Sequence, residues 1–197
     1  MTTFVKICGL TDETAIETAV DAGADAIGFV FFDKSPRNIT PQAASRLAKY
    51  IPAQVRRVAV MRHPAAALWD EVQQVLQPDA LQTDSEDFAY LTVAATVDKW
   101  PVLREGAVPD TESLPATFIY EGRNSGRGQT VDWDAAAAIA TRGNMILAGG
   151  LDQGNVATAI ARVAPYGVDV SSAVESQPGI KDAAKIRAFI EAAKAAA

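Results

Sequence analysis

The chain contains a single cysteine and a single histidine, and these low counts exclude several kinds of site. One cysteine cannot form an intrachain disulfide, and one residue of each type cannot build a Cys/His zinc cluster, which needs about four such ligands. A Ser-His-Asp triad would have to use His63, the only histidine present. A surface or capping role is the simpler interpretation of His63.

Positive charge and long apolar segments are also scarce. The chain has 18 Lys and Arg against 24 Asp and Glu, a net charge of −6, whereas nucleic-acid binders have a basic surface. The longest strongly apolar run, Ala26 to Phe32, is far shorter than the roughly 20 residues that span a bilayer. The N-terminus, MTTFVKICGLTDE, lacks the basic and apolar regions of a signal peptide. We therefore expect a cytoplasmic protein with neither nucleic acid nor a membrane as a partner.

Short apolar runs alternate with helical segments along the chain. The runs are typical of parallel strands buried on both faces, and they predict eight strands: Phe4–Cys8, Ala26–Phe32, Val55–Met61, Ala80–Gln82, Val102–Arg104, Thr117–Glu121, Met145–Ala148 and Val168–Val170. Segments with a helical period predict helices that begin with a cap at Thr11 or cover Gln42–Tyr50, Ala65–Leu76, Asp134–Thr141, Gln153–Val163 and Asp182–Ala196. No helix is predicted over Gly106–Pro115, because this segment contains two prolines.

This alternation predicts an α/β protein with one compact (β/α)₈ TIM barrel over residues 1–197, with a shortened or missing helix after the fifth strand. The length lies at the lower edge of the range for that fold, so the connections must be short. A doubly wound open sheet is the competing architecture. Its dinucleotide-binding version is not favoured, because no GxGxxG motif follows the first strand. No linker or shift in composition marks a second domain.

The first predicted strand ends at Cys8, and strand ends are where a barrel places its active site. Gly9 follows, and a helix is predicted to begin at Thr11. A nearby helix N-terminus favours the thiolate form that a base or a nucleophile requires. A buried structural cysteine is the alternative interpretation.

Two charged residues follow the ends of other strands. Arg37, held at a loop edge by Pro36, can bind a carboxylate or phosphate through two hydrogen bonds, or it is a solvated surface residue. Glu121 ends the sixth strand, where a barrel carries an acid or base, and it can equally be a structural partner. The glycine-rich segment after it, residues 122–129, is long enough to act as a lid over a ligand.

The loops after the seventh and eighth strands indicate a phosphate site. Gly149 and Gly150 precede a predicted helix, so backbone N–H groups can approach an anion there. Ser171 and Ser172 add two hydroxyl groups at the neighbouring strand end. This pair of loops is the frequent phosphate site of TIM barrels.

Four segments, in order along the chain, resemble the phosphoribosylanthranilate isomerases of tryptophan biosynthesis. They are KICGLT (6–11), GFVF with SPR (28–31 and 35–37), LAGGL (147–151), and VDVSS with PGIKD (168–172 and 178–182). The resemblance runs essentially from end to end, and the first and last of these segments are the specific ones.

This resemblance implies an Amadori rearrangement of N-(5′-phosphoribosyl)anthranilate to 1-(2-carboxyphenylamino)-1-deoxyribulose 5-phosphate, with no cofactor and no metal. It implies that Cys8 is the base that takes the C2′ proton, and that a strand-six carboxylate, here Glu121, is the acid that opens the ribose ring. It assigns the anthranilate end of the substrate to Arg37. It assigns the phosphate to four residues: Gly149, Gly150, Ser171 and Ser172. Monomer and homodimer both stay open.

The sequence departs from the family pattern at three places. Glu121 stands where the acid is usually aspartate, the segment Gly126–Thr130 lacks the usual lysine, and Gln82–Ser85 lacks the usual strand-four histidine. These departures keep a non-catalytic barrel that binds a phosphorylated metabolite as an alternative. Another phosphosugar isomerase is the second alternative, although such barrels use paired aspartates instead of Cys8.

Overall fold

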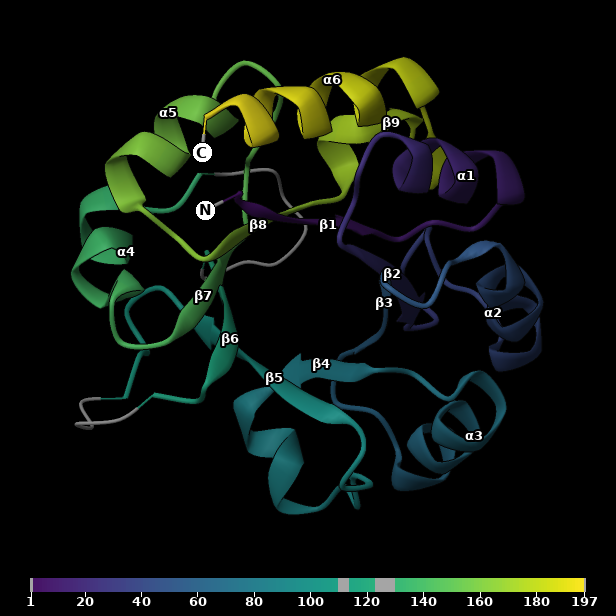
Figure 1. Cartoon of the computed structure of the whole chain (residues 1–197). Helices are drawn as coiled ribbons and strands as arrows, with labels where there is room; N and C mark the ends of the chain where they lie inside the picture. The colour runs from purple at the N-terminus through teal and green to yellow at the C-terminus, as the bar shows by residue number, and fades with distance from the viewer. Residues whose placement is uncertain (1, 110–113, 123–129, 197) are drawn as a thin grey trace.

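In the computed structural model, the strands close into a ring and the helices lie outside it (Figure 1). The structure describes residues 2–109, 114–122 and 130–196. Within these residues the closed barrel has eight parallel strands, in chain order β1 (Phe4–Cys8), β2 (Ala26–Phe31), β3 (Arg56–Met61), β4 (Ala80–Asp84), β5 (Asp98–Arg104), β6 (Thr117–Glu121), β7 (Asn144–Leu147) and β8 (Gly167–Val170). The ring closes because β1 pairs with both β2 and β8.

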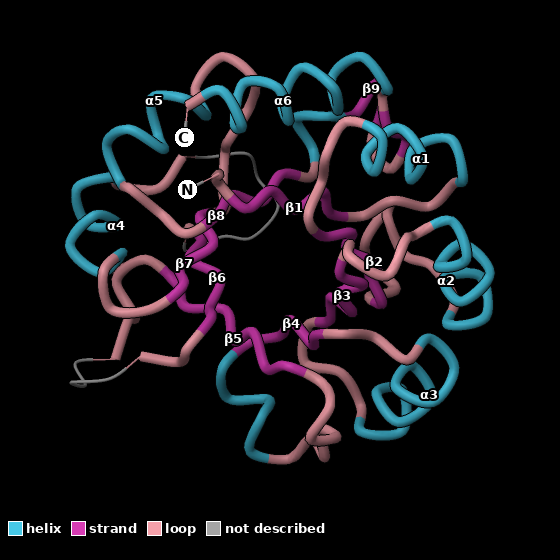
Figure 2. The backbone as a smooth tube through the Cα atoms, in the orientation of Figure 1, coloured by secondary structure: helices cyan, strands magenta, loops and turns pink. Residues whose placement is uncertain are grey.

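The helices surround the ring of strands, as Figure 2 shows. The α-helices are α1 (Glu13–Asp21), α2 (Pro41–Leu47), α3 (Ala66–Leu76), α4 (Trp133–Ala140), α5 (Val156–Val163) and α6 (Ala183–Ala195). Short 3₁₀ helices cover η1 (Ala48–Tyr50), η2 (Ser85–Ala89) and η3 (Ser172–Val174). A small antiparallel hairpin, β9 (Glu175–Gln177) and β10 (Ile180–Lys181), precedes α6.

The predicted barrel is confirmed, and its burial explains the apolar runs in the sequence. Every residue of β2 is buried, because one side of each strand faces the barrel interior and the other faces the helices. The apolar residues form two separate clusters accordingly. The smaller cluster includes Val58, Trp100 and Ile146 from three different strands. The larger cluster includes Ile16, Trp69 and other residues on the helices that cover the barrel.

The connections after β4 and β5 are the least regular. The 3₁₀ helix η2, which the apolar pattern did not predict, follows β4. Residues 105–109 and 114–116 after β5 contain no helix, in agreement with the missing helix predicted there. The prediction for residues 110–113 lies outside the described residues.

Some predicted boundaries are wrong by a few residues. The cap of α1 is Asp12 and not Thr11, because the Asp12 carboxylate accepts a hydrogen bond from the backbone N–H of Ala15 at 2.9 Å. The strand β5 begins at Asp98, four residues before the predicted start at Val102. Asp98 and Lys99 are exposed and carry no apolar signal, and Pro101 is uncommon inside a strand, although these residues pair with β4.

Candidate active site

A cavity of about 350 Å³ opens at the carboxyl ends of the strands. Its lining includes Cys8 from β1, Asp84 from β4, Arg104 from β5 and Glu121 from β6. Arg37, from the connection between β2 and α2, also lines it. The barrel therefore brings Cys8, Glu121 and Arg37, which are far apart in the sequence, to one cavity.

Cys8 lies next to a buried ion pair. Lys6, two residues earlier on β1, is fully buried, and its Nζ donates a hydrogen bond to Asp169 Oδ1 on β8 at 2.8 Å. Gly28 of β2 lies beside Cys8 in the sheet, and a Cβ atom there would come within 3.1 Å of Cys8 Sγ and 3.3 Å of Lys6 Cε. The absence of a side chain at Gly28 thus leaves room for the thiol and the ammonium together.

The positive charge of Lys6 opposes the effect of burial on the pKa of Cys8. Burial raises the pKa of the Cys8 thiol above its ordinary value, while the neighbouring Lys6 ammonium favours the thiolate. Burial alone would lower the pKa of Lys6, but the charges of Asp169 and Cys8 and the hydrogen bonds to both together outweigh it and hold that pKa above its ordinary value. Lys6 therefore stays cationic beside the thiol at neutral pH.

Arg37 is held from behind by a buried carboxylate. Its Nε and Nη2 donate to Glu175 Oε1 and Oε2 at 2.6 and 2.8 Å, and Lys181 Nζ also donates to Glu175 Oε1, at 2.9 Å. Burial would raise the pKa of Glu175, but its bonds to Arg37 and Lys181 lower it below the ordinary value. Gly9 makes room for the Arg37 stem, because a Cβ atom there would lie 2.5 Å from Arg37 Cδ. Arg37 is thus fixed at the cavity wall and is not a solvated surface residue.

Glu121 belongs to an ion-pair chain that crosses three strands. The register places Arg104 of β5 directly opposite Glu121 of β6, and Arg104 Nη1 donates to Glu121 Oε1. Arg104 Nη2 donates to Asp84 Oδ1 on β4. One guanidinium therefore joins two carboxylates at the cavity wall, and side chains from β4, β5 and β6 are fixed together.

A second cavity, of about 90 Å³, adjoins the first one. Its lining includes all four residues of the predicted phosphate site, Gly149, Gly150, Ser171 and Ser172. Glu121, Asp169 and Ser171 line both cavities, so the two lie side by side. Gly149 and Gly150 have φ angles of 92° and 63°, in the region that favours glycine.

Hydrogen bonds hold the two phosphate-site loops in place. Asn155 Nδ2 donates to the carbonyl of Gly150 at 2.8 Å, and its Oδ1 accepts from the backbone N–H of Asp152 at 2.9 Å. On the other loop, Ser171 Oγ donates to the carbonyl of Cys8 at 3.1 Å. The end of β8 is thereby tied to the end of β1.

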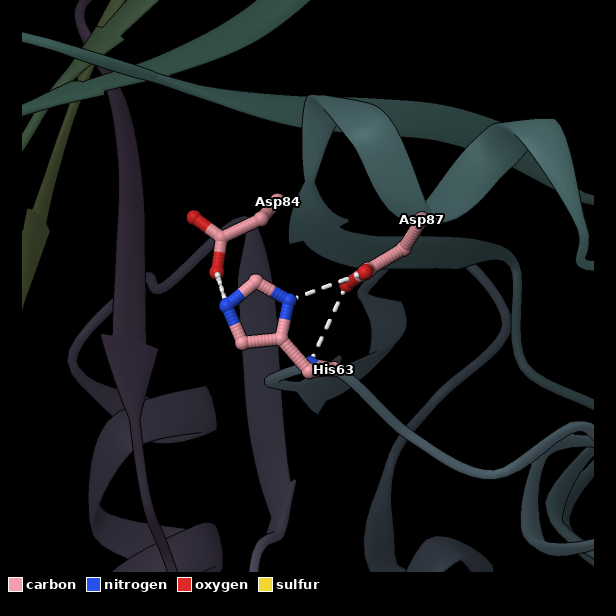
Figure 3. A group of neighbouring side chains, drawn as sticks. All are labelled: His63, Asp84 and Asp87. Atoms are coloured by element: carbon pink, nitrogen blue, oxygen red, sulfur yellow. Dashed lines mark hydrogen bonds and ion pairs between the residues drawn. The ribbon is translucent and has the colours of Figure 1, made fainter.

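His63 lies between two aspartates (Figure 3). Its Nδ1 is 3.0 Å from Asp87 Oδ1, and its Nε2 is 3.4 Å from Asp84 Oδ2. These three residues can each offer one ligand atom, all within 4.8 Å of one another, and form the group in the described part of the chain that could hold a metal ion. The two ring nitrogens face different carboxylates, however, and Arg104 already pairs with Asp84. The arrangement fits a hydrogen-bonded ion-pair network better than a metal site.

Sequence reasoning missed four residues of this site: Lys6, Gln82, Asp84 and Arg104. All but Lys6 line the larger cavity. Within the described residues, no hydrogen bond reaches the buried Oε1 of Gln82. For two of them, the position in the sequence was a signal that could have identified them. Asp84 and Arg104 end β4 and β5, just as Cys8 and Glu121 end β1 and β6.

Two further observations concern the chain after Glu121. The predicted lid over 122–129 lies outside the described residues from position 123 onward. Asp132 caps α4, because its carboxylate accepts from the backbone N–H groups of Asp134 and Ala135 at 2.9 and 3.2 Å. Among the described residues that line the two cavities, Asp132 is absent.

Comparison with known families and proteins gives concordant results. Residues 5–192 match the family model described as N-(5′phosphoribosyl)anthranilate (PRA) isomerase. A protein of Citrifermentans bemidjiense named N-(5′-phosphoribosyl)anthranilate isomerase is 40% identical over 204 residues, covering 98% of this chain and 97% of the relative. A protein of the same name from Pelobacter propionicus is 38% identical over 201 residues, with 96% and 95% covered.

Solved structures of that name share the fold. A phosphoribosyl anthranilate isomerase in complex with reduced 1-(o-carboxyphenylamino)-1-deoxyribulose 5-phosphate superposes with a TM-score of 0.80 and 31% identity, covering 98% of this chain and 99% of the other. Monomers generated from the dimeric enzyme of Thermotoga maritima superpose with a TM-score of 0.78 and 29% identity, with the same coverage. In the described part of this chain, no helix is long and apolar enough to cross a membrane.

Proposed function

The chain belongs to the N-(5′-phosphoribosyl)anthranilate isomerase family, and from this premise we propose that Cys8 is the base and Glu121 the acid of its reaction. The reaction is the Amadori rearrangement of N-(5′-phosphoribosyl)anthranilate, a step of tryptophan biosynthesis. An acid must protonate the ribose ring oxygen so that the ring opens to a Schiff base. A base must then take the proton from C2′, which gives an enolamine that becomes the ketone product.

The order of the strands is the observation that carries this proposal. Around the barrel, β7 and β8 lie between β6 and β1. A phosphate bound by the loops after β7 and β8 would therefore direct the ribose between Glu121 on β6 and Cys8 on β1. Both residues line the cavity in which that ribose would lie, so an acid and a base would flank the reacting carbons.

The surroundings of Cys8 support its role as the base. A thiol acts as a base only as the thiolate, and burial disfavours that form. The fully buried Lys6 ammonium is the group that compensates, because it favours a negative charge on Cys8. Asp169 keeps Lys6 in place through the 2.8 Å hydrogen bond, and so the pair prepares the thiol without touching the substrate.

The position of Glu121 supports its role as the acid. It lines both the larger cavity and the phosphate-side cavity, so its carboxyl group would lie beside the ring oxygen of a ribose bound there. Arg104 holds one carboxylate oxygen of Glu121, Oε1. Glutamate is one methylene longer than the aspartate usual in the family, and we infer that this contact with Arg104 places the longer side chain correctly.

The substrate-binding roles follow from the same cavity. Arg37 retains N–H donors beyond the two that bind Glu175, and we assign them to the anthranilate carboxylate. Gly149, Gly150, Ser171 and Ser172 would bind the phosphate. Gln82 also lines this cavity and would contact the bound substrate.

The remaining parts of the proposal concern the whole protein. We propose one barrel domain over residues 1–197, acting in the cytoplasm on a small phosphorylated substrate, with no cofactor or metal and no nucleic-acid or membrane partner. Monomer and homodimer are both compatible with it, since the enzyme of Thermotoga maritima is named as dimeric and has been studied as monomers.

The test is the steady-state turnover of phosphoribosylanthranilate, followed by its loss of fluorescence. We expect kcat of Cys8→Ala and of Glu121→Gln each to fall by about 10²–10⁴-fold, the usual contribution of one positioned proton-transfer group. Asp132→Asn is the matched control, because Asp132 is a nearby carboxylate that caps a helix. Its kcat should stay within about twofold of the wild-type value.

Each other outcome has a definite meaning. An unchanged kcat in Glu121→Gln would place the acid elsewhere, and a large loss in Asp132→Asn would point to that residue. A wild-type protein that binds the substrate without converting it would support the non-catalytic barrel instead.

A further inference from the structure

We propose that His63 is a positioning residue for Glu121 and acts on it through Asp84 and Arg104. This inference rests on the proposed role of Glu121 as the acid. His63 follows β3 and lines a side cavity with Asp84 and Arg104, but it is not among the residues that line the larger cavity. It would therefore act on the reaction without contacting the substrate.

A continuous series of ion pairs connects His63 to Glu121. Asp84 is buried and divides its two oxygens between two cations, since Oδ2 faces His63 Nε2 at 3.4 Å and Oδ1 accepts from Arg104 Nη2. Arg104 in turn divides its two terminal nitrogens between Asp84 and Glu121. Both carboxylates therefore help to set the position of Arg104.

Asp87 fixes the histidine end of this chain. Its carboxylate accepts hydrogen bonds from the backbone N–H of His63 at 3.1 Å, from Thr83 Oγ1 at 2.5 Å and from Tyr90 Oη at 3.1 Å. The His63 ring is the fourth partner, at 3.0 Å. His63 has a φ of 45°, a left-handed backbone conformation that is costly for a non-glycine residue. The contacts with Asp87 hold the ring in place despite this cost.

The surroundings favour the imidazolium form of His63. A neutral imidazole would direct a lone pair at one of the two carboxylates, whereas the imidazolium donates a hydrogen bond to Asp87 and faces Asp84 as an ion-pair partner. The hydrogen bond to Asp87 is the largest cause that raises the pKa of His63 above its ordinary value, and the charges of Asp84 and Glu86 add to it. Arg62 and Arg104 are the cations that line the same side cavity.

Deprotonation of His63 would disturb the balance at Arg104. While His63 is charged, it neutralises part of the charge of Asp84, and Arg104 can also hold Glu121. When His63 loses its proton, Asp84 keeps Arg104 as its cationic partner within the described residues and attracts it more strongly. Glu121 then loses its contact with Arg104, and kcat falls as the pH rises through the pKa of His63.

The network can be observed directly, because His63 is the only histidine of the chain. In tag-free protein, the imidazole signal in a ¹H–¹³C correlation spectrum reports His63 alone. We expect it to titrate with a midpoint above the ordinary value of about 6.5. We expect Glu121→Gln to lower that midpoint by about half a pH unit, because Arg104, no longer shared with a second carboxylate, would compensate Asp84 more fully.

A double-mutant cycle separates a relay through Arg104 from a direct effect of charge. In an Arg104→Met background, Glu121→Gln should leave the His63 midpoint unchanged. The same shift with and without Arg104 would overturn the inference, and so would no shift in either background.

Turnover supplies the second readout. The ratio of wild-type kcat to kcat of His63→Gln should be about tenfold near pH 6 and approach one above the His63 midpoint, because a displaced catalytic group costs rate. The ratio removes the pH dependence that both proteins share, including that of Cys8. KM should stay within about twofold. A ratio that does not change with pH would indicate a merely structural role and contradict the inference.

The two proposals fail in distinguishable ways. Absent coupling, together with a large loss of kcat in Glu121→Gln, would overturn the role of His63 and leave the acid intact. A normal coupling with unchanged kcat in Glu121→Gln would overturn the acid itself and, with it, the positioning role of His63.

Discussion

The two sides of the cavity are built by different means. On the β7–β8 side, Gly149 and Gly150 adopt positive φ angles and present backbone to the smaller cavity. On the β4–β6 side, the wall is made by the side chains of Asp84, Arg104 and Glu121, which contact one another across three strands. The first side is suited to a fixed anion such as a phosphate. The second side is suited to a group whose contacts change during the reaction, because each charged side chain there already contacts an oppositely charged one.

The largest effect is expected at the buried ion pair of Lys6 and Asp169, where the two sides of the cavity meet. Asp169 lines both cavities, and Lys6→Met would remove the cation that is hydrogen-bonded to its buried carboxylate. Removal of one partner of such a pair costs about 3–5 kcal/mol of unfolding free energy, measurable by urea denaturation. The double variant Lys6→Met/Asp169→Asn removes both charges and should recover most of the loss. A double variant as unstable as the single one would show that packing, and not charge, makes the pair important.

The next largest effect tests the β4–β6 side of the cavity, which is made of side chains. Arg104→Met removes the cation that joins Asp84 to Glu121, and we expect kcat to fall by about a hundredfold because the acid loses its place. KM should change by less than about threefold, as measured by the same turnover assay. Arg57→Met is the control, since Arg57 forms an ion pair with Asp79 near the other end of β3. An equal loss of kcat in the control would contradict a specific role for Arg104.

The β7–β8 side, where backbone faces the smaller cavity, should respond in the opposite way, with a change in KM and not in kcat. Gly149→Ala places a side chain where φ is 92°, which displaces the loop, and we expect KM to rise about tenfold with kcat within about twofold. Gly23→Ala is a matched control, because Gly23 also has a positive φ, 95°, with nothing within 4 Å of an added Cβ. The control should cost stability only, by about 1 kcal/mol. If Gly149→Ala lowers kcat and not KM, the two sides are not functionally distinct.

The smallest expected effect is a pH dependence of stability on the β4–β6 side. Burial opposes ionisation of Asp87, but its bonds to Thr83, His63 and Tyr90 lower its pKa below the ordinary value. The unfolded chain therefore binds the proton more readily, so this contribution is present above about pH 4 and is lost as the pH falls further. Urea unfolding of wild type and Asp87→Asn between pH 3 and pH 6 should show a difference of about 1 kcal/mol that shrinks in acid. A difference that stays constant would contradict it.

The same contrast explains how much the sequence could predict. The barrel and its eight strands follow from buried apolar runs, and the β7–β8 loops follow from glycines and serines at strand ends, which are local signals. The contact between Arg104 and Glu121 depends on the register of β5 against β6, which an apolar pattern does not determine. The clamp of Glu175 on Arg37 joins residues 138 positions apart through a short hairpin that has no periodic signal.

The central claim is that Cys8 takes the C2′ proton while Glu121 opens the ring, and an isotope effect separates these roles most directly. The measurement compares kcat for substrate carrying hydrogen or deuterium at C2′ in Cys8→Ser and in Glu121→Gln. A weakened base makes proton abstraction limiting, so Cys8→Ser should show a large primary isotope effect. A weakened acid makes ring opening limiting, so Glu121→Gln should show almost none. Equal isotope effects in the two variants, or a larger one in Glu121→Gln, would contradict the assignment.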